Sequence, residues 1–200
     1  MDRGVTVASS KIERWQLRRG DHIYARRSSA ANVYCHHGIY ESDKKVIHFT
    51  NPSAQSSTGF SSSSAFSSSS YIFCWECRQA MHGGGVVSCC LDCFLEGDSL
   101  RLFAYSVPLW FYTASNVGMI VVNRARLTCH MADEDPPEAV LERANYLLRN
   151  GFGTYDALVN NCFDFAFYCK TGGTLVSPAR AVMIGLNPEP VQNNPTCMIL

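Results

Sequence analysis

The sequence has no net charge and no long uninterrupted hydrophobic run, and each absence excludes a class of function. Lysine and arginine number 17, as do aspartate and glutamate, in a chain of 200 residues. The charges are balanced, so the sequence shows no basic excess that would indicate a nucleic-acid partner. The most apolar stretch, 107–122, is broken by proline, asparagine and glycine and is too short to span a bilayer. The first twenty residues also lack the apolar segment of a signal peptide.

The chain does contain ten cysteines. Without an export signal, so many cysteines indicate a reducing compartment, where thiols bind metal, perform chemistry or pack in a core. We therefore expect a cytoplasmic protein.

Strand patterns come first along the chain and helix patterns come last. Short runs rich in isoleucine, valine, tyrosine and phenylalanine predict strands in 20–27, 36–42, 45–50 and 100–107, the second and third forming a hairpin. A helix is expected from Pro136, with Asp135 as its N-cap and Gly151 at its end. A second helix is expected between the cap Asn161 and the glycine pair at 172–173. This order predicts an α+β fold.

Composition divides the chain into one domain with appended segments. Residues 54–70 are a low-complexity serine run that cannot bury enough apolar surface to become ordered. We expect a flexible lead over 1–11, a domain over 12–176 that contains the serine-rich insertion 54–70 and a cysteine-rich loop 74–93, and a flexible tail over 177–200.

Cys162 is the first candidate for chemistry. It follows the proposed cap Asn161 and so lies in the first turn of a helix, where free backbone N–H groups and the helix dipole favour a thiolate. The alternative is a small core residue, because Cys162 shares a helix face with Phe165, Ala166 and Cys169.

A nucleophilic cysteine needs a base, which here must come from six histidines. His36 and His48 are twelve residues apart across the predicted hairpin. They share a sheet face only if the loop between the strands has an odd number of residues; a two-residue loop pairs His37 with His48 instead. Periodicity alone leaves both registers open.

The segments GDHIYARR, HHGIYES, VIHFT and NNCFDFA together resemble the lecithin:retinol acyltransferase (LRAT) family, most closely its plant NC-domain branch. The likeness extends from about Ile12 to Gly173, apart from the serine run. It implies a circularly permuted NlpC/P60 (papain-like) fold, in which an antiparallel sheet precedes two helices and the catalytic cysteine begins a helix.

The resemblance implies that Cys162 is the nucleophile, His36 the base and His48 the residue that polarises the base. His36 would then face the cysteine helix, and His37 would lie on the other face. The expected activity is acyl transfer from, or hydrolysis of, phospholipids or other acyl esters through a thioester, with no catalytic cofactor. Phe163 stands where the family commonly has an acidic residue. The alternative function is a catalytically silent, stress-related interaction module.

A second cysteine pattern predicts a structural zinc site. Cys74 and Cys77, then Cys90 and Cys93, form two CxxC pairs. Cys89 is a competing ligand, and His82 could replace one thiolate. Alternatively, the segment LDCF around Cys93 is a strand that simply buries this thiol.

A metal site at Cys35, His36, His37 and His48 is disfavoured, because adjacent strand residues point to opposite faces. Finally, Cys197-Met-Ile-Leu fits a prenylation pattern, but no basic segment precedes it. Together with a phospholipid substrate, this pattern gives the expectation of a peripheral membrane contact.

Overall fold

The computed structural model describes residues 11–29, 32–51, 74, 85–115 and 127–174. Its strands are β1 His22–Ser29, β2 Asn32–Ser42, β3 Lys45–Thr50, β4 Gly85–Cys89 and β5 Arg101–Leu102. Its helices are the 3-10 turn η1 Arg14–Gln16 and α1 Leu91–Leu95, α2 Leu109–Ser115, α3 Pro137–Asn150 and α4 Cys162–Thr171.

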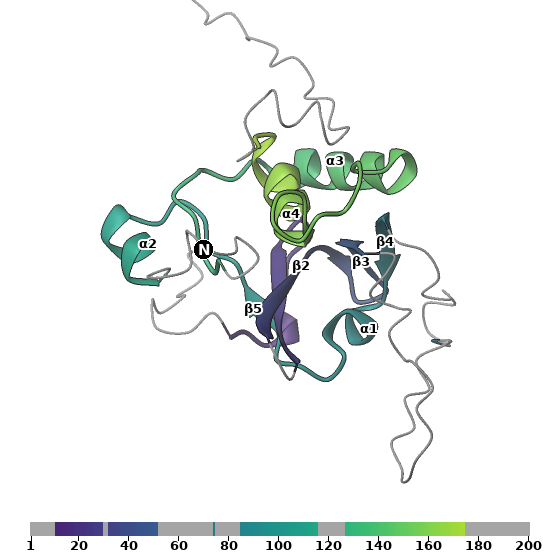
Figure 1. Ribbon diagram of the computed structural model, residues 1–200, viewed down its shortest axis with the longest axis horizontal. Helices are drawn as coiled ribbons and strands as arrows, with labels where there is room; N and C mark the ends of the chain where they lie inside the picture. The colour runs from purple at the N-terminus through teal and green to yellow at the C-terminus, as the bar shows by residue number, and fades with distance from the viewer. Residues whose placement is uncertain (1–10, 30–31, 52–73, 75–84, 116–126, 175–200) are drawn as a thin grey trace, which may run out of the picture.

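The strands form one antiparallel sheet in the order β4-β3-β2-β1-β5. Helices α3 and α4 lie on one side of the sheet and α1 lies on the other, whereas α2 stands apart from both (Figure 1). Ile39, Ile47 and Phe49 pack with α3 and α4. Ile23 and Val46 belong to the core on the α1 side. The expected α+β class is confirmed.

The hairpin of β2 and β3 has the register that the sequence left open. Gly38 pairs with His48 and Tyr40 with Val46, but Ser42 pairs with Lys45 because a bulge lies between Tyr40 and Ser42. The extra residue makes the connection effectively odd, so His36 and His48 share one face of the sheet while His37 lies on the other.

Several predicted elements have different bounds. Strand β5 is much shorter than the expected 100–107: Ala104 already leaves the sheet to bridge Cys129, and Ser106 has a left-handed backbone with φ 52°. Helix α3 begins at Pro137, one residue later than expected, with Pro136 as its N-cap. The carboxylate of Asp135, the cap expected from the sequence, instead accepts a hydrogen bond from Arg143 at 2.6 Å.

The segment LDCF forms the start of α1, so the alternative in which it is a strand is wrong. The serine run 54–70, the tail 177–200 with Cys197, and the expected ligands Cys77 and His82 lie outside the described residues. In the described ranges, no helix is both long enough and apolar enough to cross a membrane.

Candidate active site

Helix α4 begins at Cys162 because the preceding residue caps it. The side-chain oxygen of Asn161 accepts hydrogen bonds from the backbone N–H groups of Phe163 at 2.9 Å and Asp164 at 3.4 Å. The Asp164 carboxylate accepts one in return from the N–H of Asn161 at 3.0 Å. The cap residue is the one predicted from the sequence, and Asp164 completes a capping box with it. It fixes Cys162 at the first helical position.

The Cys162 thiol lies against the backbone of β2. It is 1% exposed, and its Sγ–H donates to the carbonyl oxygen of Cys35 at 3.6 Å. Strand β3 pairs with β2 only from Gly38 onward, so it does not pair with Cys35. Sequence reasoning could not foresee this contact, because it joins residues far apart in the chain.

Burial dominates the acid–base behaviour of this thiol. It raises the pKa of Cys162 to about 12, against the effect of the backbone N–H groups of His37 and Phe163, which favour the thiolate. The helix start acts in the expected direction, but the expectation that the pKa is lowered overall is wrong, because removal from water outweighs the helix terminus. The resting site holds a neutral thiol.

His36 and His48 form a hydrogen-bonded pair. Nε2 of His36 lies 2.9 Å from Nδ1 of His48, and the Phe94 ring contacts both imidazoles at 5.3 and 5.5 Å between centroids. Nε2 of His48 lies 3.2 Å from Sγ of Cys89. If N–H groups donate from His36 to His48 and from His48 to Cys89, Nδ1 of His36 is left without a proton and can act as a base.

Both imidazoles are neutral near pH 7. Burial lowers the pKa of His48 to about 4, with a further contribution from Arg27. Burial also lowers the pKa of His36 well below its usual value, and the charges of His48 and Arg27 add to this effect.

The face of the sheet that His36 occupies is not the face that α4 covers. Cys35 packs with Phe163 and Phe167 of α4, and the His37 ring contacts Phe163 at 5.5 Å. The expectation that His36 points toward the cysteine helix is therefore wrong, because helix α4 docks on the odd-numbered side chains of β2. Among the described residues, the His36 ring makes its hydrogen bond to His48 and not to Cys162.

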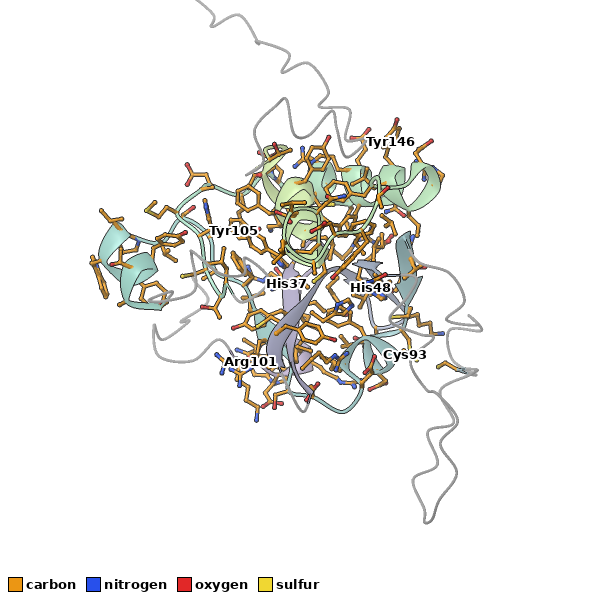
Figure 2. All side chains as sticks on the ribbon, viewed as in Figure 1. His37, His48, Cys93, Arg101, Tyr105 and Tyr146 are labelled. Carbon is orange, nitrogen blue, oxygen red and sulfur yellow. The ribbon has the colours of Figure 1, made fainter. Side chains whose placement is uncertain are left out.

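A second buried histidine pair lies on the α4 face. Nε2 of His22 is 2.9 Å from Nδ1 of His37, and Nδ1 of His22 is 2.9 Å from the Tyr105 hydroxyl. Figure 2 shows His37 and Tyr105 in the left part of the view and His48 and Cys93 in the right part. Burial lowers the pKa of His22 well below its usual value. No local pattern predicts this pair, because it forms only through the alignment of β1 with β2.

Two tyrosines complete the surroundings of the thiol, and neither was identified from the sequence. Burial raises the pKa of Tyr155, and the neighbouring Cys162 and Tyr34 raise it further. Burial also raises the pKa of Tyr34, to which Cys162 contributes. Both hydroxyls therefore remain protonated and can act as hydrogen-bond donors near the thiol.

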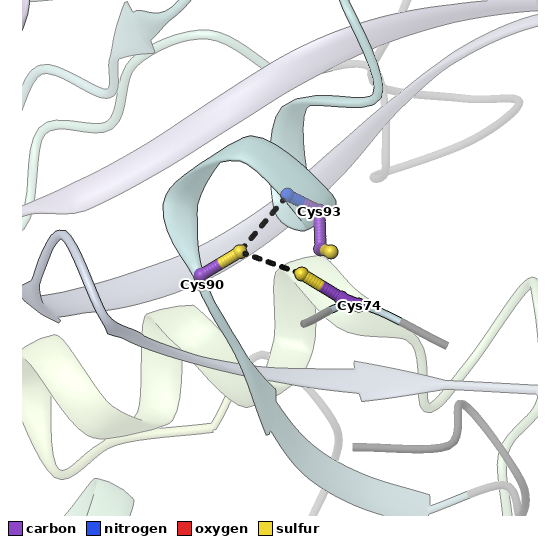
Figure 3. A group of neighbouring side chains, drawn as sticks. All are labelled: Cys74, Cys90 and Cys93. Atoms are coloured by element: carbon purple, nitrogen blue, oxygen red, sulfur yellow. Dashed lines mark hydrogen bonds between the residues drawn. The ribbon is translucent and has the colours of Figure 1, made fainter. Parts of the chain in front are cut away.

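The structure brings together three of the four predicted metal ligands. The sulfur atoms of Cys74, Cys90 and Cys93 all lie within 4.8 Å of one another (Figure 3). The competing ligand Cys89 instead contacts His48. The disfavoured site at Cys35, His36, His37 and His48 is not assembled, because its members lie on two faces of the sheet.

Comparison with known proteins gives two matches. The family model described as lecithin retinol acyltransferase matches residues 15–175. The Arabidopsis thaliana protein named LEAD-SENSITIVE 1 is 42% identical over 188 residues, a match that covers 89% of this chain and 69% of that protein. No solved structure matches the chain.

Proposed function

The chain belongs to the lecithin retinol acyltransferase family, and from this membership we propose that it is a thiol acyltransferase or phospholipid acylhydrolase that forms an acyl-cysteine at Cys162. The observation that carries the proposal is the placement of this thiol. It begins a capped helix and binds the carbonyl of Cys35, next in sequence to His36. No resident cofactor takes part in these steps.

The proposed base is His36. Its Nε2 is held by His48, so Nδ1 is the ring atom open to a thiol proton. Since the Cys162 thiol donates to a backbone carbonyl in the resting state, we propose that it rotates toward His36 when an ester substrate binds. Hydrogen bonds between catalytic groups often tighten only in the substrate complex.

The reaction then has two halves. The S–H bond of Cys162 breaks, its proton moves to Nδ1 of His36, and the sulfur attacks the ester carbonyl. Backbone N–H groups at the helix start stabilise the oxyanion. The carbon–oxygen ester bond breaks, and the leaving alcohol takes the proton from His36. Water or an acceptor amine or alcohol then releases the acyl group and restores the thiol.

Because burial keeps both partners neutral, the proposed pair is a thiol and an imidazole rather than a preformed thiolate and imidazolium. Proton transfer therefore accompanies attack, as in general-base catalysis. This distinguishes the proposed site from cysteine enzymes in which the ion pair exists before substrate arrives.

The test is formation of a thioester with a phospholipid or a short-chain ester probe. Intact-protein mass spectrometry should detect one acyl group on the wild type, released by hydroxylamine, and none on Cys162→Ala. Cys169→Ala is the matched control, because Cys169 is a buried thiol on the same helix, and it should still be acylated. Absence of any adduct on the folded wild type would contradict the proposal and support the silent interaction module.

We propose three further features that agree with this function. The order of sheet and cysteine helix suits a circularly permuted NlpC/P60 fold. The two CxxC pairs, Cys74 with Cys77 and Cys90 with Cys93, would hold a zinc ion that is structural, since four thiolates leave no open position. No disulfide joins any two of the eight described cysteines, which suits the cytoplasm.

A peripheral membrane contact is also proposed, because the substrate class resides in bilayers. Helix α2 supports it: Leu109 is 62% exposed and Trp110 is 65% exposed, and the helix stands apart from the sheet (Figure 1). Exposed aromatic and leucine side chains of this kind favour the membrane interface.

A further inference from the structure

Three sulfur atoms on the α1 side of the sheet have the spacing of metal ligands. Sγ of Cys74 lies 3.7 Å from Sγ of Cys90, and Cys93 completes the group (Figure 3). With zinc–sulfur bonds of about 2.3 Å, two thiolates in a tetrahedral site are about 3.8 Å apart. The backbone N–H of Cys93 also donates to Sγ of Cys90 at 3.5 Å, which stabilises a thiolate there.

Two of these cysteines adjoin residues that touch the His36–His48 pair. Cys89 immediately precedes Cys90, and its sulfur lies 3.2 Å from Nε2 of His48. Phe94 immediately follows Cys93, and its ring contacts both imidazoles. Two connections therefore link the sulfur cluster to the histidine pair. One runs from Cys90 to its neighbour Cys89, and the other from Cys93 to its neighbour Phe94.

Helix α1, which contains Cys93 and Phe94, is too short to be stable without contacts from other parts of the fold. Helix α1 has five residues, far fewer than an isolated helix needs to be stable. Arg27 holds its far end through the carbonyl oxygens of Phe94 and Leu95, at 2.5 Å each. Cys90 is its N-cap and Cys93 its third residue, so an ion bound there would hold the first turn.

We infer that Cys74, Cys90 and Cys93 bind one thiophilic divalent ion, zinc in the cell, and that this ion positions the His36–His48 pair through Cys89 and Phe94. Thiolates select zinc over the hard cations that carboxylates prefer. The ion is not part of the reaction: it fixes the segment against which the histidines pack. The positioning half of the inference rests on the proposed function; the binding half does not.

Metal binding is tested first, on the full chain. Native mass spectrometry should find one zinc per chain in the wild type and none in Cys93→Ser. Cys129→Ala is the control, since Cys129 is buried but outside the cluster, and it should keep the ion. Cobalt(II) in place of zinc should give a thiolate charge-transfer band that Cys93→Ser lacks. Retention of the ion by Cys93→Ser, or a Cys74–Cys90 disulfide in freshly reduced protein, would overturn the assignment.

Positioning is tested first by the side-chain NMR signals of the histidines in the cobalt-substituted wild type. This measurement needs no variant, so misfolding of a variant cannot affect it. Paramagnetic shifts should be larger for His36 and His48 than for His22 and His37 across the sheet. Cys89→Ala should keep the zinc yet displace the His48 signals, and Cys89→Ser, which retains a hydroxyl partner, should restore them. Equal shifts for the two pairs, or an unmoved His48 in Cys89→Ala, would refute the positioning role.

None of these measurements requires turnover. A protein that binds zinc and shows the expected shifts but forms no thioester would refute the proposed acyl transfer and leave the metal site standing. A protein that is acylated but binds no zinc would refute the metal site and leave the proposed acyl transfer standing.

Discussion

Replacing His36 by glutamine should slow acyl-enzyme formation at Cys162 by a factor of roughly one hundred or more, the usual contribution of a positioned general base. Glutamine keeps an N–H that can donate to Nδ1 of His48 in place of Nε2. It therefore avoids leaving that buried nitrogen unpaired, which would cost about 1–3 kcal/mol of stability. The loss of rate should appear without a comparable loss of the free energy of unfolding.

His37→Gln is the matched control. His37 is the adjacent residue, is equally part of β2 and also bonds to another histidine, but on the opposite face. Glutamine can likewise keep a hydrogen bond to His22, so the rate should fall far less than in His36→Gln. His48→Gln should lie between the two, since His48 only orients and polarises the base.

The assay is the single-turnover rate of thioester formation, followed by quenched intact-protein mass spectrometry between pH 5 and pH 9. Because burial lowers the pKa of His36 and raises that of Cys162, the rate should fall only as pH drops through the lowered pKa of His36. A rate that falls above pH 7 would indicate a preformed thiolate–imidazolium pair. An active His36→Gln beside an inactive His37→Gln would refute the assignment and place the base on the α4 face.

Three further predictions concern stability and membrane contact. Since burial lowers the pKa of His48 from 6.5 to about 4, the unfolded chain takes up this proton first as pH falls. Up to about 3 kcal/mol of stability, present above pH 6.5, should be lost by about pH 4; urea titrations should show a weaker loss in His48→Gln, and an equal one would contradict the shift. Asn161→Ala removes the α4 cap and should cost about 1–2 kcal/mol in the same titrations, whereas an unchanged midpoint would mean that the cap contributes nothing. Trp110→Ala should weaken sedimentation with phosphatidylcholine vesicles while leaving the melting temperature unchanged, and equal sedimentation would exclude α2 as the contact.

The local structure around the site could be predicted from the sequence because its signals are local. Asn161 and Asp164 are three residues apart, which is the spacing of a capping box, and Gly172 closes the same helix in a left-handed conformation. The three N-terminal strands and their hairpin follow from alternating side chains in the same way. The sequence signals that predict each of these helices and strands lie within the element itself.

The arrangement across the sheet could not be predicted, because it depends on which face a distant helix covers. The alternation of side chains along a strand correctly places His36 and His37 on opposite faces of the sheet. It does not say which of the two faces α4 covers. The Phe163, Phe167 and Cys35 cluster places α4 against His37. Likewise, the pKa of Cys162 depends on burial between segments far apart in the chain, whereas the helix-start argument considers only its neighbours.

The contact between the Cys162 thiol and the Cys35 carbonyl spans 127 residues of chain. Interactions of such high sequence separation form late in folding, because the loop they close must first lose its conformational freedom. During synthesis the strands leave the ribosome long before α4, and the apolar face with Ile39, Ile47 and Phe49 is only partly covered, by α3, until that helix arrives. A chain that stops before α4 should therefore aggregate. The residue proposed to react with lipid esters is thus folded into place only after the strands, and a partly made chain that still lacks α4 cannot carry out the proposed reaction.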